Sequence, residues 1–218
     1  MTSAVPTVGE AYERDGYAPL PAFLPRPLAE ALYGRIVAEL DLQRPRQQFV
    51  AQGNLLTKPA IEVYSHIYPP LAGFLWGMTP AIEGHVGKRL IPTYAYFRIY
   101  QQGDLCKVHS DRHACEHSLS LTLAVSDDRP WALSVETRRL DGPTAAVDPD
   151  FGEEPFGTVP MMPGDAVLYQ GVHHRHARLD PNPNRWSAHA FLHWIDPEGP
   201  YRDQAFDRPA LAAAGRAA

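Results

Sequence analysis

The sequence predicts an α+β fold in which helices of the N-terminal part pack on an antiparallel double-stranded β-helix, that is, a jelly-roll barrel. Helical periodicity is confined to about the first ninety residues, and short strand-like segments separated by turn residues follow it. The chain has 218 residues, 44% of them hydrophobic, which suits one domain with a substantial core. We therefore expect a single domain over residues 1–218.

The helical part is expected at about 17–90, after a loose leader at 1–14. Residues 27–40 begin with a proline and carry apolar residues four positions apart, which is typical of an amphipathic helix. These apolar residues are Leu28, Leu32, Ile36 and Leu40. A second helical region is expected at 71–90, with an interruption near Thr79-Pro80.

The β-helix core is expected at about 92–196. An aromatic-rich segment that ends in a Gln-Gly-Asp turn and an alternating segment further on both predict strands. The expected strands are 94–100, 118–125, 131–137, 158–162, 166–169 and 186–195. The acidic stretch 141–157 contains Gly and Pro and is expected to be a mobile loop, and about 203–218 a flexible tail.

Charge and cysteine content argue against several classes of function. A formal net charge of -5 without a long Lys or Arg run gives no electrostatic basis for binding nucleic acid or a membrane surface. The first twenty residues lack the basic and apolar regions of a secretory signal, and no apolar run approaches the length of a membrane span. Cys106 and Cys115 cannot form a disulfide framework. We expect a cytoplasmic protein with reduced thiols.

Histidines gather in two short windows of the chain. They are His109, His113 and His117, then His173, His174 and His176. In an extended segment residues i and i+2 point to the same side, so His109 and Asp111 can converge on one cation. Two imidazoles and one carboxylate suit non-haem Fe(II) and leave coordination positions open. A histidine of the second window would complete such a site.

Arg185 opens the last predicted strand, directly after a Pro-Asn-Pro-Asn turn. A hairpin of this kind would bring Arg185 back beside His176. The planar guanidinium binds a carboxylate through two hydrogen bonds and stays charged when buried. Ser187 lies on the same face of the strand and could donate a further hydrogen bond.

The region 92–196 resembles the prolyl-4-hydroxylase-like branch of the Fe(II)/2-oxoglutarate-dependent dioxygenases. The likeness rests on Tyr100-Gln101-Gln102-Gly103-Asp104, His109-Ser110-Asp111, Pro163-Gly164-Asp165 before His176, and Arg185-x-Ser187, with Asp15-Gly16-Tyr17 as a weaker match. It implies that iron is bound by His109, Asp111 and His176. His176 is preferred to His173 and His174 because its nine-residue interval to Arg185 matches the likeness.

The resemblance also implies how 2-oxoglutarate is held. Arg185 would bind its distal carboxylate, with Ser187 and Tyr100 as further contacts. Many relatives have a tyrosine three residues before the first ligand, whereas this chain has Cys106, so the second co-substrate contact is not assigned. The implied reaction converts 2-oxoglutarate and O2 to succinate and an oxidised substrate. Because Asp111 keeps the carboxylate ligand, hydroxylation or desaturation is expected in place of halogenation.

The expected substrate is a small molecule, such as an amino acid or a natural-product intermediate. Tyr96 and Arg98 share strand parity with Tyr100 and would line its pocket. Arg98 and Arg112 would favour a carboxylate-bearing substrate. Two other functions stay open: hydroxylation of a protein or peptide side chain, and metal or ligand binding by a cupin-like protein without turnover.

Two alternative residue sets compete with the metal triad. A zinc site could use Cys106, His109, His113 and Cys115, but this spacing does not match the common structural zinc patterns. In the other set, His193 would be the distal histidine ligand and Arg202 would take the place of Arg185, because the same nine-residue interval separates them. However, Glu198-Gly199-Pro200 would end a strand between the two residues.

Overall fold

The computed structural model describes residues 6–217, and side chains as far as residue 213. Its strands are β1 (Tyr17–Leu20), β2 (Val50–Ala51), β3 (Ala60–Tyr64), β4 (Ile91–Gln101), β5 (Cys106–His109), β6 (His117–Val125), β7 (Leu133–Glu136), β8 (Phe156–Val159), β9 (Ala166–Tyr169), β10 (His176–Arg178) and β11 (Trp186–Ile195). Its helices are α1 (Val8–Asp15), α2 (Arg26–Leu40), α3 (Pro70–Val86) and α4 (Arg208–Ala217), with short 3-10 helices η1 (Gln47–Phe49), η2 (His113–Cys115) and η3 (Arg202–Asp207).

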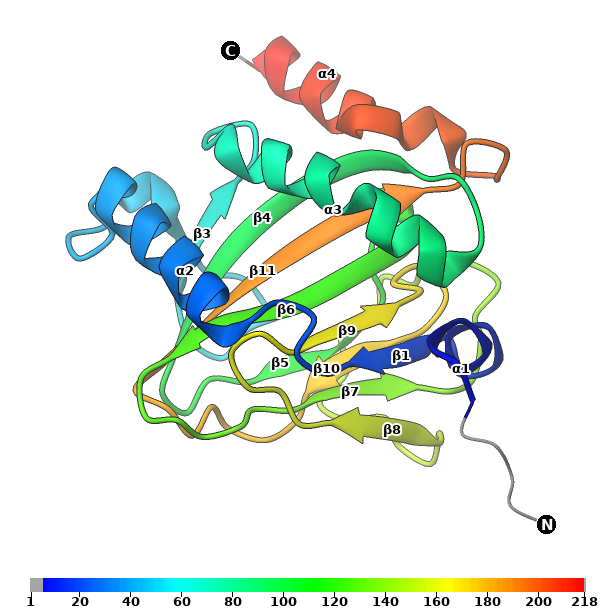
Figure 1. Cartoon of the computed structure of the whole chain (residues 1–218), viewed down its shortest axis with the longest axis horizontal. Helices are drawn as coiled ribbons and strands as arrows, with labels where there is room; N and C mark the ends of the chain where they lie inside the picture. Colours follow the sequence, from blue (N-terminus) through cyan, green and yellow to red (C-terminus); the bar gives the residue numbers. More distant parts are fainter. Residues whose placement is uncertain (1–5, 218) are drawn as a thin grey trace.

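Two antiparallel sheets form the core of the molecule (Figure 1). The larger has the order β1-β9-β6-β11-β4-β3-β2, and the smaller has the order β5-β10-β7-β8. Helices α2 and α3 lie across one face of the larger sheet, and the smaller sheet lies on its other side. The predicted double-stranded β-helix with helices packed on it is therefore confirmed.

Strand parity divides the larger sheet into an apolar outer face and a polar inner face. On β11, the residues Ala188, Ala190, Leu192 and Trp194 join the core beneath the helices. The alternate residues of that strand point into the barrel, because successive side chains of a strand face opposite sides. These inner residues are Ser187, His189, Phe191 and His193, and β6 adds Ser118, Ser120 and Thr122. The inner face therefore carries the polar side chains that could bind a metal ion or a ligand inside the barrel.

The N-terminal part is less helical than predicted. The expected loose leader contains α1, whose N-terminus is fixed by a capping box between Thr7 and Glu10; residues 1–5 lie outside the described part of the chain. The segment 17–90 also supplies β1, β2 and β3, and β1 pairs with β9 at the edge of the larger sheet.

Helix α3 continues through Pro80 without the predicted interruption. Thr79, the residue before Pro80, is buried and donates a hydrogen bond from its hydroxyl to the carbonyl of Leu75 (3.0 Å). Trp194 of β11 in turn donates its indole N–H to the Thr79 hydroxyl (2.9 Å). Packing against the sheet outweighs the local preference of the residue before proline.

The C-terminal segment, predicted to be a flexible tail, instead forms η3 and α4. Phe206 stacks on Trp76 of α3 with ring centroids 6.0 Å apart. Asp207 accepts two hydrogen bonds from Arg112, at 2.6 and 2.9 Å. These contacts tie the segment to α3 and to Arg112, the residue that follows the predicted ligand Asp111.

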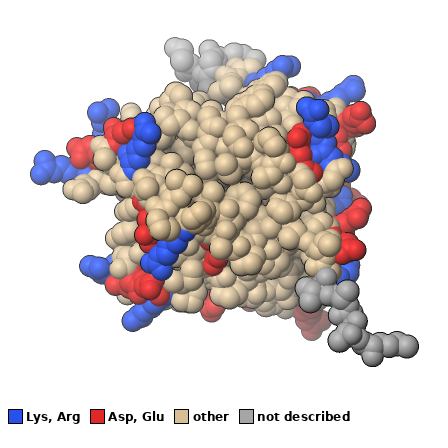
Figure 2. Space-filling model, in the orientation of Figure 1, with Lys and Arg blue, Asp and Glu red and all other residues tan. Residues whose placement is uncertain are grey.

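None of the described helices is long and apolar enough to cross a membrane. On the face shown in Figure 2, Lys and Arg lie among Asp and Glu around the margins, and the centre carries neither. That face therefore offers no broad patch of one charge.

A buried histidine links α1 to β6 and makes stability depend on pH. His117 is 7% exposed, and its Nδ1 lies 2.6 Å from the hydroxyl of Tyr12. Burial lowers the pKa of His117 to about 4. The unfolded chain therefore binds more protons than the folded chain between about pH 6.5 and pH 4, so stability falls as the pH falls through this window.

We expect this histidine to cost about 2 kcal/mol of unfolding free energy at pH 5 relative to pH 8. His117→Gln keeps a polar partner for Tyr12 but removes the titrating group. Urea unfolding of both proteins at the two pH values, with a chelator present, should show the native protein losing about 2 kcal/mol more than the variant. Parallel pH dependences would contradict the assignment.

Candidate metal centre

His109 and His176 meet across two neighbouring strands of the smaller sheet. His109 ends β5, His176 begins β10, and the two are register partners in this antiparallel pair. Directly opposed side chains in such a pair share one face of the sheet. Their imidazole centroids are 4.3 Å apart. Strand pairing thus joins two histidines that are distant in sequence.

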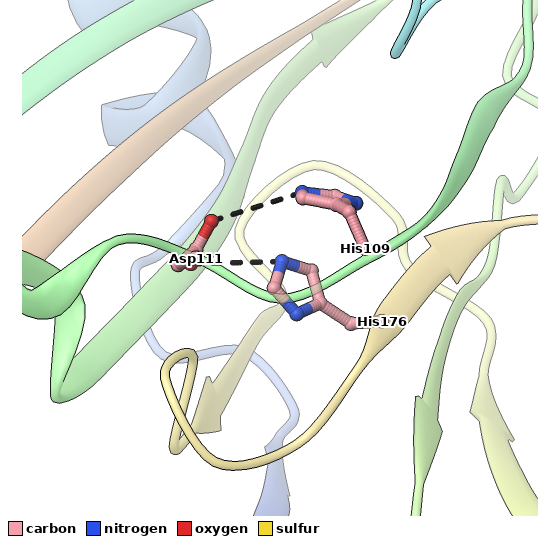
Figure 3. A group of neighbouring side chains, drawn as sticks. All are labelled: His109, Asp111 and His176. Atoms are coloured by element: carbon pink, nitrogen blue, oxygen red, sulfur yellow. Dashed lines mark ion pairs between the residues drawn. The ribbon is translucent and has the colours of Figure 1, made fainter. Parts of the chain in front are cut away.

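Asp111 turns back towards both rings from the loop after β5 (Figure 3). Its Oδ1 lies 3.7 Å from Nε2 of His109, and its Oδ2 lies 3.6 Å from Nε2 of His176. The three residues place potential ligand atoms within 4.8 Å of one another. Two imidazole nitrogens and one carboxylate around one point suit a divalent transition metal, and non-haem Fe(II) in particular.

Backbone carbonyls set the orientation of both imidazoles. Nδ1 of His109 lies 2.8 Å from the carbonyl oxygen of Lys107, and Nδ1 of His176 lies 3.1 Å from that of His174. A carbonyl can only accept, so each Nδ1 carries a proton and each Nε2 keeps a free lone pair. Both rings are therefore oriented to ligate a metal through Nε2.

The protonation states also suit a metal. Burial, aided by the nearby His176, lowers the pKa of His109 to about 4, which leaves its imidazole neutral at pH 7. Burial alone would raise the pKa of Asp111, but His176 and His109 outweigh it and lower that pKa. A neutral imidazole and an ionised carboxylate are the forms that bind metal ions.

Gly171 fixes the position of the Asp111 carboxylate. Asp111 donates its backbone N–H to the carbonyl of Gly171 (2.8 Å), and a Cβ at position 171 would lie only 2.4 Å from Asp111 Oδ2. That oxygen is buried and has no hydrogen-bond partner among residues 6–213. An unpaired buried carboxylate oxygen is costly, and a bound cation would compensate it.

The structure places Tyr96, Arg98 and Tyr100 around a small cavity, about 20 Å³, that also borders the triad. Cys106, the departure from the resembled family, lies there too. Arg98 is buried and donates to Glu62 (2.7 Å) and to the hydroxyl of Tyr100 (2.9 Å).

Arg185 does not lie beside His176, so the predicted position is wrong. Its side chain is 72% exposed and pairs with Asp127. His176 lies in the smaller sheet. Arg185 directly precedes β11 of the larger sheet, and its carbonyl accepts a hydrogen bond from the N–H of Gln102, which follows β4. Ser187 is buried at that same end, where it donates to Asn182 (2.8 Å). The turn therefore returns the chain to a different sheet.

Arg112 is also absent from the cavity lining. It pairs with Asp207, and its guanidinium lies 4.2 Å from the ring centroid of Tyr94. The charge is thus already neutralised, which removes the reason to assign it to a substrate carboxylate.

Sequence reasoning missed Arg178, which lies two residues after His176 on β10 and is 1% exposed. It borders the same cavity as the triad. The i,i+2 spacing from His176 was a usable signal, because it places both side chains on one face of a strand.

The competing ligand sets are not assembled. Among the described residues, the groups able to hold a metal include neither His173 nor His174, and they do not unite Cys106 with His109, His113 and Cys115. Nδ1 of His174 bonds to the carbonyl of Glu136 (2.8 Å), and that of His173 bonds to the carbonyl of Leu140 (2.9 Å). Arg202 does not border the cavity.

The close packing at Gly171 makes a sharp test of the metal centre. Gly171→Ala should displace the Asp111 carboxylate and weaken metal binding by roughly tenfold or more, the range seen when support of a ligand is lost. Titration with Co(II), followed by visible absorption, measures the affinity. Gly142→Ala is the control, because a Cβ there meets no atom within 4 Å. Equal affinities in the two variants would argue against Asp111 as a ligand.

Comparison with known proteins adds a structural likeness. No family model and no curated protein sequence matches this chain. Among solved structures, the non-heme alpha-ketoglutarate-dependent carbocyclase SnoK from nogalamycin biosynthesis is similar, with a TM-score of 0.70 and 16% identity over 94% of this chain and 89% of SnoK.

Two further structures are similar over most of their length. A prolyl-4-hydroxylase from Pseudomonas putida has a TM-score of 0.55 and 15% identity, over 85% of this chain and 96% of that one. HygX from Streptomyces hygroscopicus, with nickel, 2-oxoglutarate and hygromycin B bound, has a TM-score of 0.62 and 9% identity, over 86% of this chain and 85% of that one. The chain therefore shares its fold with these three structures, one of a non-heme alpha-ketoglutarate-dependent enzyme and one with 2-oxoglutarate bound.

Proposed function

We propose that the protein is an Fe(II)/2-oxoglutarate-dependent oxygenase that hydroxylates or desaturates a small molecule. His109, Asp111 and His176 would hold the iron, and Arg178, in place of Arg185, would bind the distal carboxylate of 2-oxoglutarate. Bound Fe(II) would supply the redox chemistry by which O2 and 2-oxoglutarate yield succinate, CO2 and oxidised substrate. The observation that carries the proposal is the buried, uncompensated charge of Arg178 beside the triad.

Arg178 has polar neighbours but no acidic partner within the described part of the chain. It donates to the carbonyl of Trp131 (2.8 Å), to Ser120 (3.3 Å) and to Nδ1 of His189 (3.2 Å). Its guanidinium also lies 4.6 Å from the Trp131 ring centroid. Burial lowers the pKa of Arg178, which reflects the cost of keeping this charge from water. A carboxylate arriving there would compensate that cost.

Arg98 is the other buried guanidinium at this cavity, and its charge is already balanced. Glu62 pairs with it, and both side chains are largely buried. Burial alone would lower the pKa of Arg98, but Tyr100, Tyr96 and Glu62 outweigh it and raise that pKa. A ligand carboxylate therefore has more to gain at Arg178 than at Arg98.

Position along the strand supports the same assignment. Arg178 is two residues from His176, a separation of about 7 Å along a strand. A chelating five-carbon dicarboxylate spans a similar length, so one end could reach the metal while the other meets Arg178. His189 lies beside Arg178, at the end of the cavity proposed for the distal carboxylate. Its Nδ1 accepts a hydrogen bond from Arg178, so its proton is on Nε2. Among residues 6–213 this Nε2 has no partner, and it could donate to the same carboxylate.

Several features support a small-molecule substrate. The cavity at the triad is small and lined mainly by aromatic, histidine and arginine side chains, and it would have to widen to admit a ligand, which a small molecule requires least. The similar HygX was solved with hygromycin B, and SnoN, also similar, with a nogalamycin compound. Because Asp111 is retained as a carboxylate, hydroxylation or desaturation fits better than halogenation.

Arg178→Met should weaken 2-oxoglutarate binding at least thirtyfold or so, since truncating one partner of a buried charge pair costs about 2 kcal/mol or more. The visible charge-transfer band of the anaerobic Fe(II) complex reports this affinity. The variant without co-substrate should keep or raise its melting temperature, because an unpaired buried charge is removed. Arg185→Met is the matched control and should bind normally. Loss in the Arg185 variant alone would reverse the assignment.

Turnover tests the reaction itself. Succinate release with O2 consumption should rise with one or more members of a panel of amino acids and natural products, and His176→Ala should abolish it. Peptides of varied sequence form the second arm of the panel. Stimulation by peptides alone would favour a protein or peptide hydroxylase. Metal and co-substrate binding with no stimulated or unstimulated turnover would favour a binding protein.

A further inference from the structure

His193 lies next to Asp111 but belongs to none of the roles assigned so far. It is on β11, is 1% exposed, and shares a strand face with His189. His193, Asp111 and Cys115 each place one potential ligand atom within 4.8 Å of the others. Nε2 of His193 and Oδ2 of Asp111 are both buried and, within residues 6–213, both lack a hydrogen-bond partner. A donor and an acceptor are thus unpaired in one small space.

We propose that His193 is a positioning residue that donates a hydrogen bond from Nε2 to the Asp111 carboxylate and so holds that carboxylate for metal binding. This inference rests on the proposed metal site and extends it to a fourth side chain. The hydrogen bond would form when Asp111 binds the metal. An oriented and hydrogen-bonded ligand binds more tightly than one that is free to rotate.

Ser118 determines which nitrogen of His193 carries the proton. The two residues are register partners on β6 and β11, and the Ser118 hydroxyl lies 2.8 Å from Nδ1 of His193. The same hydroxyl can instead donate to the carbonyl of Cys115 (3.3 Å), a longer contact. If Ser118 donates to Nδ1, the proton of the imidazole must be on Nε2. The other tautomer would turn the Nε2 lone pair towards a carboxylate, which electrostatics disfavours.

The sheet holds the His193 ring in place. The β4–β11 pairing shifts register between Leu192 and Trp194, so His193 lies opposite an irregularity of β4 that contains Tyr94. Tyr94 packs against the ring with centroids 4.5 Å apart. The imidazole therefore has little freedom to turn away from Asp111.

A second metal ion bound by Asp111, Cys115 and His193 is the competing interpretation. Tyr94 already contacts the sulfur of Cys115 at 3.2 Å, which occupies the thiol. Two divalent cations sharing one carboxylate would also repel four times as strongly as two unit charges at the same distance. This contact and this repulsion favour a hydrogen-bonding role for His193.

The experiment measures the affinity and stoichiometry of Co(II) for four proteins without added 2-oxoglutarate. His193→Leu should weaken binding at least tenfold or so, and His193→Gln, whose amide nitrogen can occupy the place of Nε2, should recover most of it. His117→Leu is the matched control: that histidine is also buried and also bonded through Nδ1 to a hydroxyl, of Tyr12 (2.6 Å), but it does not border the cavity at the triad. It should bind Co(II) normally.

Each outcome decides the question. Failure of the native protein to bind Co(II) would overturn the metal site itself, whereas normal binding by His193→Leu would overturn only the role of His193. Equal losses in the Leu and Gln variants would mean that the ring is needed for packing. Two equivalents of Co(II), with a thiolate charge-transfer band that Cys115→Ser removes, would establish the second metal instead. If His193→Leu does not fold, Ser118→Ala should give a smaller loss of affinity by the same route.

Discussion

The pairing of β5 with β10 is the constraint on which the site depends. Because His109 and His176 are register partners in an antiparallel pair, a slip of one residue would turn one ring to the opposite face of the sheet. The carboxylate of Asp111 is then fixed by a backbone hydrogen bond to Gly171 and by the close approach of that glycine. Neither histidine needs a charged neighbour for its orientation, since backbone carbonyls hold both Nδ1 atoms. Sheet geometry thus produces a donor set with both Nε2 atoms free.

Charge balance inside the barrel distinguishes structural from functional groups. Arg98 and Glu62 form a pair that is satisfied without any ligand. Arg178 is as deeply buried and has only neutral partners among the described residues. A buried charge of this kind lowers the stability of the ligand-free protein, and the interaction with an incoming carboxylate is stronger for the same reason. The unbalanced guanidinium is therefore the better candidate for an anion site.

Local periodicity predicted the fold class, because strand and helix patterns repeat within a few residues. His109 and Asp111 lie close together, but β5 ends at His109 and Asp111 approaches from the loop after it, so strand parity is not the reason. The position of Arg185 could not be obtained from local periodicity. It required knowing that the turn after β10 crosses to the larger sheet and that β11 then runs back towards the metal. Arg185 and His193 are eight positions apart, about 26 Å along a strand, so Arg185 lies far from the triad. The capping box of Thr7 and Glu10 was local and could have predicted α1, whereas the continuity of α3 through Pro80 depends on Trp194.

The inner row of β6 relates the two ends of the proposed co-substrate site. Ser118 contacts His193 near the metal ligands, Ser120 contacts Arg178, and Thr122 contacts His189. Alternate residues of a strand are about 7 Å apart, so this row fixes the separation between the metal end and the carboxylate end of the cavity. The hydroxyls do more than solvate buried nitrogens, because each one also limits how its partner can be protonated or turned. An uncharged polar strand opposite the ligands would therefore set both the length of the dicarboxylate that the proposed site accepts and the orientation of the groups that would hold it.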